Sequence, residues 1–172
     1  MVSRHGVARR TTGEPVDLLI MGMGKLGGGE LNASSDIDLI YLLPDEGQSD
    51  GRPDDHPDGP GGALDLQTYF TRLGRRLAGL LGESTADGLV FRVDLRLRPH
   101  GDSGPVVCSF QILENYLIRY GREWERSAWI KARLVNKAVL SEQYQFAKDA
   151  RLLETIRRPF VFRRYLDFHP LS

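Results

Sequence analysis

Two aspartates separated by one residue, Asp36 and Asp38, stand at the head of the apolar segment 36–43 (DIDLIYLL). The segment is predicted to form a strand, and residues two apart on a strand point to the same face. The two carboxylates should therefore lie side by side, where they repel each other and where burial costs free energy unless a cation compensates it. In the alternative interpretation, Asp36 caps the start of the strand after Ser34 and Ser35, and Asp38 is simply solvated.

A third carboxylate lies in segment 89–98, which alternates apolar and polar residues as a strand with one buried face does. Its polar face carries Arg92, Asp94, Arg96 and Arg98. If the two strands are neighbours, Asp94 joins the aspartate pair on an open sheet face. Three carboxylates suit Mg²⁺, which takes a few of them and completes its shell with phosphate oxygens and water. Two such ions can clamp an in-line phosphoryl or nucleotidyl displacement.

The arginines beside Asp94 strengthen this hypothesis. Arg96 and Arg98 would supply cationic groups that bind phosphate in a bidentate manner. The alternative is that both arginines belong to a solvated strand face.

The glycine-rich segment GMGKLG, Gly22 to Gly27, matches the dinucleotide-binding pattern, which is a weak signal alone. In a dinucleotide-binding unit a helix of several turns precedes the second strand, and the ribose-binding acid follows that strand. Here the second strand starts soon after the glycines and the acids precede its apolar run, so the spacing argues against that fold. It favours a tight turn whose backbone N–H groups and Lys25 hold a phosphate near the aspartates.

The segment GDSGP, Gly101 to Pro105, resembles the nucleophile segment of serine proteases. The chain lacks the disulfides, the further glycine, and the upstream histidine and aspartate in recognisable settings that such enzymes have. We therefore interpret the segment as a turn that leaves the strand 89–98.

The order of the remaining elements predicts an α+β fold, with a mixed sheet and helices followed by a helical extension. We expect a disordered lead-in at 1–15, a core at 16–108 with a surface loop at 44–62, and the extension at 109–172. The expected elements are strands at 16–21, 36–43 and 89–98, the end of a short helix at 30–35, and helices at 64–81, 109–120, 124–140 and 141–156.

Composition excludes several classes of protein. The 172 residues carry 23 basic and 23 acidic side chains, so the net charge does not indicate a partner such as nucleic acid or a membrane. No apolar run is long enough to span a bilayer. One cysteine, Cys108, excludes a disulfide within the chain, and this fits the cytoplasm.

Several segments together resemble a known family. The polymerase-beta-like nucleotidyltransferase superfamily combines a glycine turn, an Asp-x-Asp pair and a third acid on a neighbouring strand. GMGKLGGGELNASSDIDLIYLL, VFRVDLRLRPHGDSGPVV, SFQILENYLIRYGREWERSAWIKARLV and RRPFVFRRYLDF resemble the glutamine synthetase adenylyltransferases within it. The resemblance covers roughly residues 16–168. The segments ELNASSDIDLI, GREWER and RPFVFRRYLDF resemble the N-terminal, adenylyl-removing domain of that family.

The resemblance implies that Asp36, Asp38 and Asp94 are catalytic and bind Mg²⁺. Lysine at position 25 agrees with this family, although many superfamily members have Gly-Ser at the turn. The residues that the resemblance and the motifs predict to bind nucleotide or phosphate are Gly24, Lys25, Gly27, Gly28, Ser35, Arg96 and Arg98.

The resemblance also implies a reaction and its partners. The adenylyl-removing domain takes AMP from a tyrosine of adenylylated glutamine synthetase by phosphorolysis and releases ADP. Its other partners would be ATP or ADP, phosphate, and a PII signal protein acting through the full-length enzyme. Two alternatives stay open: ATP-dependent adenylylation of the same protein, and a non-catalytic fragment that binds nucleotide or partner. The family's enzymes are several times longer, so we expect the chain to be a fragment whose helical extension is truncated.

The C-terminal half gives two further expectations. Tyr116, Tyr120, Trp124 and Trp129 are predicted to pack the helices on the sheet. The basic cluster of Arg157, Arg158, Arg163 and Arg164 is expected either to contact the nucleotide or glutamine synthetase, or to be an exposed helix end near Pro159.

Overall fold

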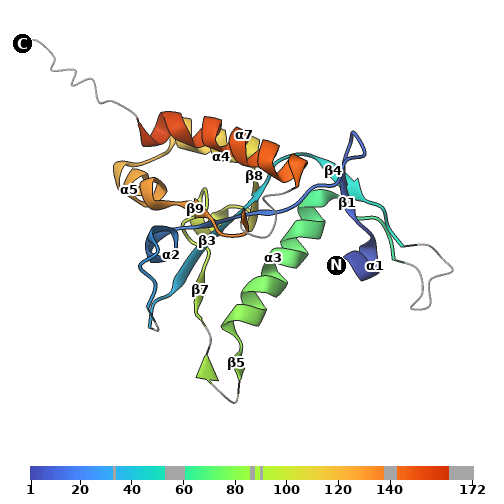
Figure 1. Ribbon diagram of the computed structural model, residues 1–172, viewed down its shortest axis with the longest axis horizontal. Coiled ribbons are helices and arrows are strands. Elements are labelled where there is room, and N and C mark those ends of the chain that lie inside the picture. The colour runs from blue at the N-terminus through green and yellow to red at the C-terminus, as the bar shows by residue number, and fades with distance from the viewer. Residues whose placement is uncertain (33, 53–60, 86–87, 90, 138–142, 163–172) are drawn as a thin grey trace, which may run out of the picture.

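The fold is organised around a five-stranded mixed sheet (Figure 1). A computed structural model describes residues 1–32, 34–52, 61–85, 88–89, 91–137 and 143–162. The central strand β3 (Ile37–Leu43) runs antiparallel to β2 (Leu19–Gly22) and parallel to β7 (Val93–Asp94) and β8 (Val107–Ser109). Strand β9 (Arg133–Leu134) pairs antiparallel with β2 at the sheet edge. The α+β prediction with a mixed sheet is confirmed.

Strand β3 is buried on both faces, and alternate residues therefore enter two different cores. Ile40 and Leu42 join one core with α4 (Phe110–Arg119), α5 (Glu123–Lys131) and α7 (Tyr144–Val161). Tyr41 and its neighbours two residues away join the other core, under α3 (Leu66–Gly82). Helices thus cover both sheet faces and leave the strand ends for chemistry.

The helices begin where the sequence supplies a cap. Asp65 precedes α3, and its carboxylate accepts a hydrogen bond of 2.8 Å from Thr68 N–H. Ser109 precedes α4, and its hydroxyl accepts one of 3.2 Å from Ile112 N–H. Side-chain acceptors of this kind satisfy N–H groups that have no partner within the first turn of a helix. The predicted helices at 64–81 and 109–120 are confirmed.

The N-terminal residues differ from the expected disordered lead-in. They form a short helix α1 (Val2–His5) and a strand β1 (Ala8–Arg10), which pairs antiparallel with β4 (Gly47–Ser49). Strand β4 lies within the expected loop 44–62, of which residues 53–60 lie outside the described part. Arg10 ties this segment to the rest of the fold, since its guanidinium pairs with Asp45 and with the buried Asp149 of α7.

The expected helical extension packs into one of the two cores of the sheet. Trp129 of α5 and Leu153 of α7 pack in one core with Leu19 of β2. The predicted helix 124–140 ends at Lys131, after which the chain forms β9. Residues 138–142 and 163–172, which include Arg163 and Arg164, lie outside the described residues.

Three shorter elements lie outside the main sheet. Ser84–Thr85 (β5) and Gly88–Leu89 (β6) form a hairpin after α3, and Gly101–Ser103 (η1) forms a single 3₁₀ turn. The segment GDSGP therefore forms the turn predicted for it. None of the described helices is both long and apolar enough to cross a membrane.

Candidate active site

The three predicted carboxylates come together at one end of β3. Asp38 and Asp94 are register partners on the parallel strands β3 and β7. Asp36 precedes β3, and the N–H of Ile37 beside it donates a hydrogen bond of 2.9 Å to the carbonyl of Arg92. The cross-strand pairing supplies the neighbour relation on which the hypothesis depended.

Two of the carboxylates face arginines. Arg92 binds Asp36 through two hydrogen bonds, Nε–Oδ1 at 2.7 Å and Nη2–Oδ2 at 2.9 Å. Arg96 binds Asp94 through Nε–Oδ2 at 2.9 Å and Nη2–Oδ2 at 2.5 Å. These guanidinium groups hold the pKa of Asp36 and the pKa of Asp94 below their ordinary values.

Asp38 is in the opposite electrostatic situation. Burial raises its pKa, and the charges of Asp94 and Asp36 raise it further. Among the described residues, no arginine or lysine donates a hydrogen bond to Asp38. The ionised form of a partly buried carboxylate beside two other carboxylates costs free energy, and a bound cation would remove this cost.

The donor chemistry of this site fits Mg²⁺, because all three groups offer carboxylate oxygens. As the side chains stand in the described residues, however, no three of them converge on one point as metal ligands. Asp36 and Asp94 turn toward Arg92 and Arg96, whose side chains are 75% and 72% exposed. These exposed arginines can move away, so the site fits a metal ion after a change of side-chain rotamers.

The glycine turn lies directly against Asp38. Gly24 has a φ of 53°, and a Cβ added there would lie 2.9 Å from Oδ2 of Asp38. The N–H of Met23 donates a 2.9 Å hydrogen bond to the carbonyl of Asp38. Gly24 therefore permits both the left-handed conformation and the close approach of backbone to carboxylate. Lys25 follows in the short helix α2 (Gly24–Gly28) and is exposed.

Three other residues predicted to bind phosphate make structural contacts. A Cβ on the buried Gly27 would lie 2.5 Å from the carbonyl oxygens of both Gly22 and Lys131, so this glycine lets α2 pack on β2 and α5. Gly28 lies beside the Glu30 and Lys131 side chains. The Ser35 hydroxyl donates to Asn32 Oδ1 at 2.6 Å.

Replacing Gly27 by alanine should destabilise the fold by about 1–3 kcal/mol, because two backbone oxygens would have to move. The matched control is Gly79→Ala in α3, where an added Cβ meets nothing within 4 Å. The control should stabilise the protein by about 0.5–1 kcal/mol, since alanine is the better helix former. Urea unfolding of both variants measures the difference, and equal effects would contradict the packing role of Gly27.

Arg98 has a backbone contact that the sequence did not predict. The segment 95–98 is a turn rather than a strand, with Arg98 N–H bonded to the carbonyl of Leu95 at 3.3 Å. The Arg98 side chain is buried and donates a further 2.8 Å bond to the same carbonyl. Arg98 therefore holds the turn while it lines the pocket at this end of the sheet. The exposed Arg92 was not among the residues predicted to bind phosphate, and it lies at the site because its backbone carbonyl pairs with Ile37.

A pocket of about 570 Å³ opens at this end of the sheet. Its lining residues include Asp36, Arg92, Asp94, Arg96, Arg98 and Asp102. Carboxylates and guanidinium groups in one open pocket can hold both a cation and the phosphate groups that accompany it.

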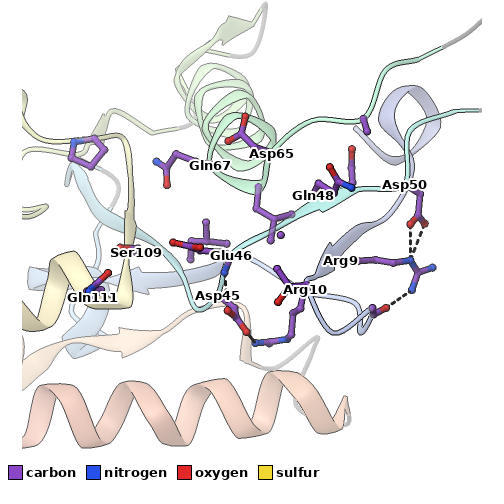
Figure 2. Close-up of a pocket in the computed structure, with 18 of the residues that line it drawn as sticks. Arg9, Arg10, Asp45, Glu46, Gln48, Asp50, Asp65, Gln67, Ser109 and Gln111 are labelled. Atoms are coloured by element: carbon purple, nitrogen blue, oxygen red, sulfur yellow. Dashed lines mark hydrogen bonds and ion pairs between the residues drawn. The ribbon is translucent and has the colours of Figure 1, made fainter.

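A larger cavity of about 1260 Å³ lies at the other end of β3, where Leu43 lines it. Figure 2 shows the polar and charged side chains that surround this cavity. Each of its two lining arginines is paired with a lining aspartate, Arg9 with Asp50 at 2.8 Å and Arg10 with Asp45 at 3.1 Å. None of the predicted site residues lines it. The smaller, carboxylate-lined pocket is therefore the candidate active site.

Comparison with known proteins places this chain in a family. A family model described as "Glutamate-ammonia ligase adenylyltransferase" matches residues 1–149. The relatives include proteins named bifunctional glutamine synthetase adenylyltransferase/adenylyl-removing enzyme. That of Burkholderia pseudomallei is 52% identical over 166 residues, which are 96% of this chain and 17% of the relative. That of Aromatoleum aromaticum is 50% identical over 172 residues, 100% of this chain and 16% of the relative. The chain spans about one sixth of the length of these relatives, and it belongs to the glutamate-ammonia ligase adenylyltransferase family.

Proposed function

We propose that this chain removes AMP from an adenylylated tyrosine of glutamine synthetase by phosphorolysis, with Mg²⁺ as cofactor. The observation that carries the proposal is the register of Asp38 with Asp94, with Asp36 two residues before Asp38 and Gly24 against its carboxylate. The names of the relatives supply the protein substrate. The ELNASSDIDLI and GREWER segments favour the removing direction.

The reaction needs charge neutralisation and alignment more than a protein nucleophile. An oxygen of inorganic phosphate attacks the phosphorus of the tyrosyl-AMP linkage, the bond to the tyrosine oxygen breaks, and that oxygen takes up a proton as ADP leaves. Arg92 and Arg96 would bind phosphate oxygens when they leave their carboxylates. Asp36, Asp38 and Asp94 would hold Mg²⁺, which supplies Lewis-acid stabilisation of the phosphoryl oxygens when bound.

The test is ADP release from adenylylated glutamine synthetase in the presence of phosphate and Mg²⁺. Phosphate-dependent ADP is the expected product. Pyrophosphate release with ATP and unmodified glutamine synthetase, in place of ADP release, would reverse the direction of the proposal. A folded chain that shows a thermal shift with Mg²⁺-ADP but no turnover would identify a binding fragment.

Mg²⁺ should also stabilise the chain without any substrate. At ten times its Kd, a ligand that binds only the folded state contributes about 1.4 kcal/mol, or roughly 3–6 °C in Tm for a chain of this size. Asp38→Asn should lose most of this shift. Arg92→Gln should show the same rise of Tm at lower Mg²⁺ concentrations than the wild type, because the guanidinium that competes for Asp36 is gone. Equal shifts in wild type and Asp38→Asn would place the cation elsewhere.

A further inference from the structure

A second, basic groove lies between the edge strand β9 and helix α7, away from the carboxylates. It has a volume of about 490 Å³, and its charged lining residues are Arg133, Lys137, Arg151, Glu154 and Arg157. Four of these are cations and one is an anion. We call this feature the β9–α7 groove.

One ion pair lies within the groove, and it leaves three of the four cations without a carboxylate partner among the described residues. Nη2 of Arg157 binds Glu154 at 2.9 Å, and Nη1 donates to the carbonyls of Trp129 at 2.8 Å and Ala132 at 3.2 Å. Arg133, Lys137 and Arg151 are exposed, and none of them is paired with a carboxylate in the described part of the chain. Three cations without a carboxylate partner among the described residues form a local positive field beside the groove, on a chain of zero net charge.

The floor of the groove is apolar and shaped by small residues. Phe146, Ala147 and Ala150 of α7 line it, together with Leu134 of β9. Positions 147, 150, 151, 154 and 157 share one face of α7, because residues three and four apart are neighbours on a helix. An apolar floor between cationic rims suits a peptide with apolar and acidic side chains. A nucleic acid would require a broader basic surface than a neutral chain offers.

The groove starts beside the glycine turn of the candidate active site. Arg133 is the register partner of Gly22, and its Nη2 donates a 3.2 Å hydrogen bond to the carbonyl of Leu26 in α2. The next residue after Gly22, Met23, is bonded to Asp38. A protein whose modified tyrosine lies at the carboxylates can therefore also contact the groove, through a segment that flanks the tyrosine. A free nucleotide at the carboxylates has no such segment.

We propose that the β9–α7 groove docks an acidic, extended segment of the adenylylated protein substrate. The inference rests on the proposed function, because it assumes that the reacting group is carried by a protein. Charges at the rim of such a surface steer association and set its salt dependence, while the apolar floor fixes the register of the segment.

The test reverses two charges that have no part in the carboxylate site. Lys137→Glu/Arg151→Glu should raise the KM for adenylylated glutamine synthetase about tenfold at low ionic strength and leave kcat unchanged. The ratio of the KM of this variant to the KM of the wild type should fall toward one in 1 M salt. The matched control, Arg75→Glu/Arg76→Glu, reverses two exposed arginines of α3 and should leave KM within about twofold of wild type. An equal rise of KM in both double variants would overturn the groove.

Two additional measurements keep the proposal falsifiable. If charge reversal prevents folding, Lys137→Gln/Arg151→Gln serves instead, with a smaller rise of KM. Direct binding of immobilised adenylylated glutamine synthetase separates docking from chemistry. Groove-dependent binding by a wild-type chain that releases no ADP would overturn the proposed reaction and support the groove. ADP release with a KM that ignores the groove charges would support the reaction and overturn the groove, as would groove-dependent binding of single-stranded DNA that displaces the protein.

Discussion

Asp38→Asn should lower the rate of AMP removal by about 10³-fold without weakening the fold. The activity should fall because Asp38 is the one member of the carboxylate triad, Asp36, Asp38 and Asp94, that no described arginine binds. Its charge is therefore available to a metal ion. The fold should not suffer, because burial and the neighbouring Asp94 and Asp36 raise the pKa of Asp38. An acid whose pKa is raised in the folded state costs stability above its ordinary pKa, and asparagine removes that cost.

The measurement pairs initial rates of ADP release with thermal unfolding at pH 7. Asp50→Asn is the control: this exposed aspartate, unlike Asp38, is paired with an arginine, Arg9 at 2.8 Å, and it lines the cavity at the other end of β3. The control should keep its activity and change the free energy of unfolding by at most about 1 kcal/mol. If Asp38→Asn kept a tenth of the wild-type rate, the triad could not be the metal site proposed here.

The parts of the fold that depend on local signals could be predicted from the sequence. The apolar run from Ile37 to Leu43 forms a strand because it is buried on both faces, and Ser109 starts a helix because its hydroxyl caps it. The Asp-x-Asp spacing placed Asp36 beside Asp38, since the geometry of a strand is a property of the chain itself.

The parts that depend on distant partners could not. Strand β9 is two residues long and exists because β2 offers Met21 and Gly22 as partners. The glycine pattern predicted a phosphate-binding role for Gly27, but it carried no sign that the backbone of Lys131 lies against this residue. The pairing of Arg92 with Asp36 likewise joins residues 56 positions apart, and periodicity carries no information about such a contact.

Trp129→Ala should destabilise the protein by about 3–5 kcal/mol, the largest loss of stability we expect from one side chain. Trp129 is 2% exposed and lies in the core between the sheet and helices α4 and α7. Removing the indole leaves a cavity that the surrounding helices can fill only in part. Urea unfolding followed by far-ultraviolet circular dichroism measures the change, because the variant also loses a fluorophore.

Trp124→Ala is the matched control on the same helix. The expectation that both tryptophans pack on the sheet is wrong for Trp124. Five residues turn an α-helix through about 140° beyond one full turn, so Trp124 and Trp129 cannot share a face. Trp124 is 57% exposed, as is usual for the outer side of a surface helix. Its replacement should cost at most about 0.5 kcal/mol. Equal losses in the two variants would mean that α5 presents a different face to the core, and the position of β9 directly after it would then have to change as well.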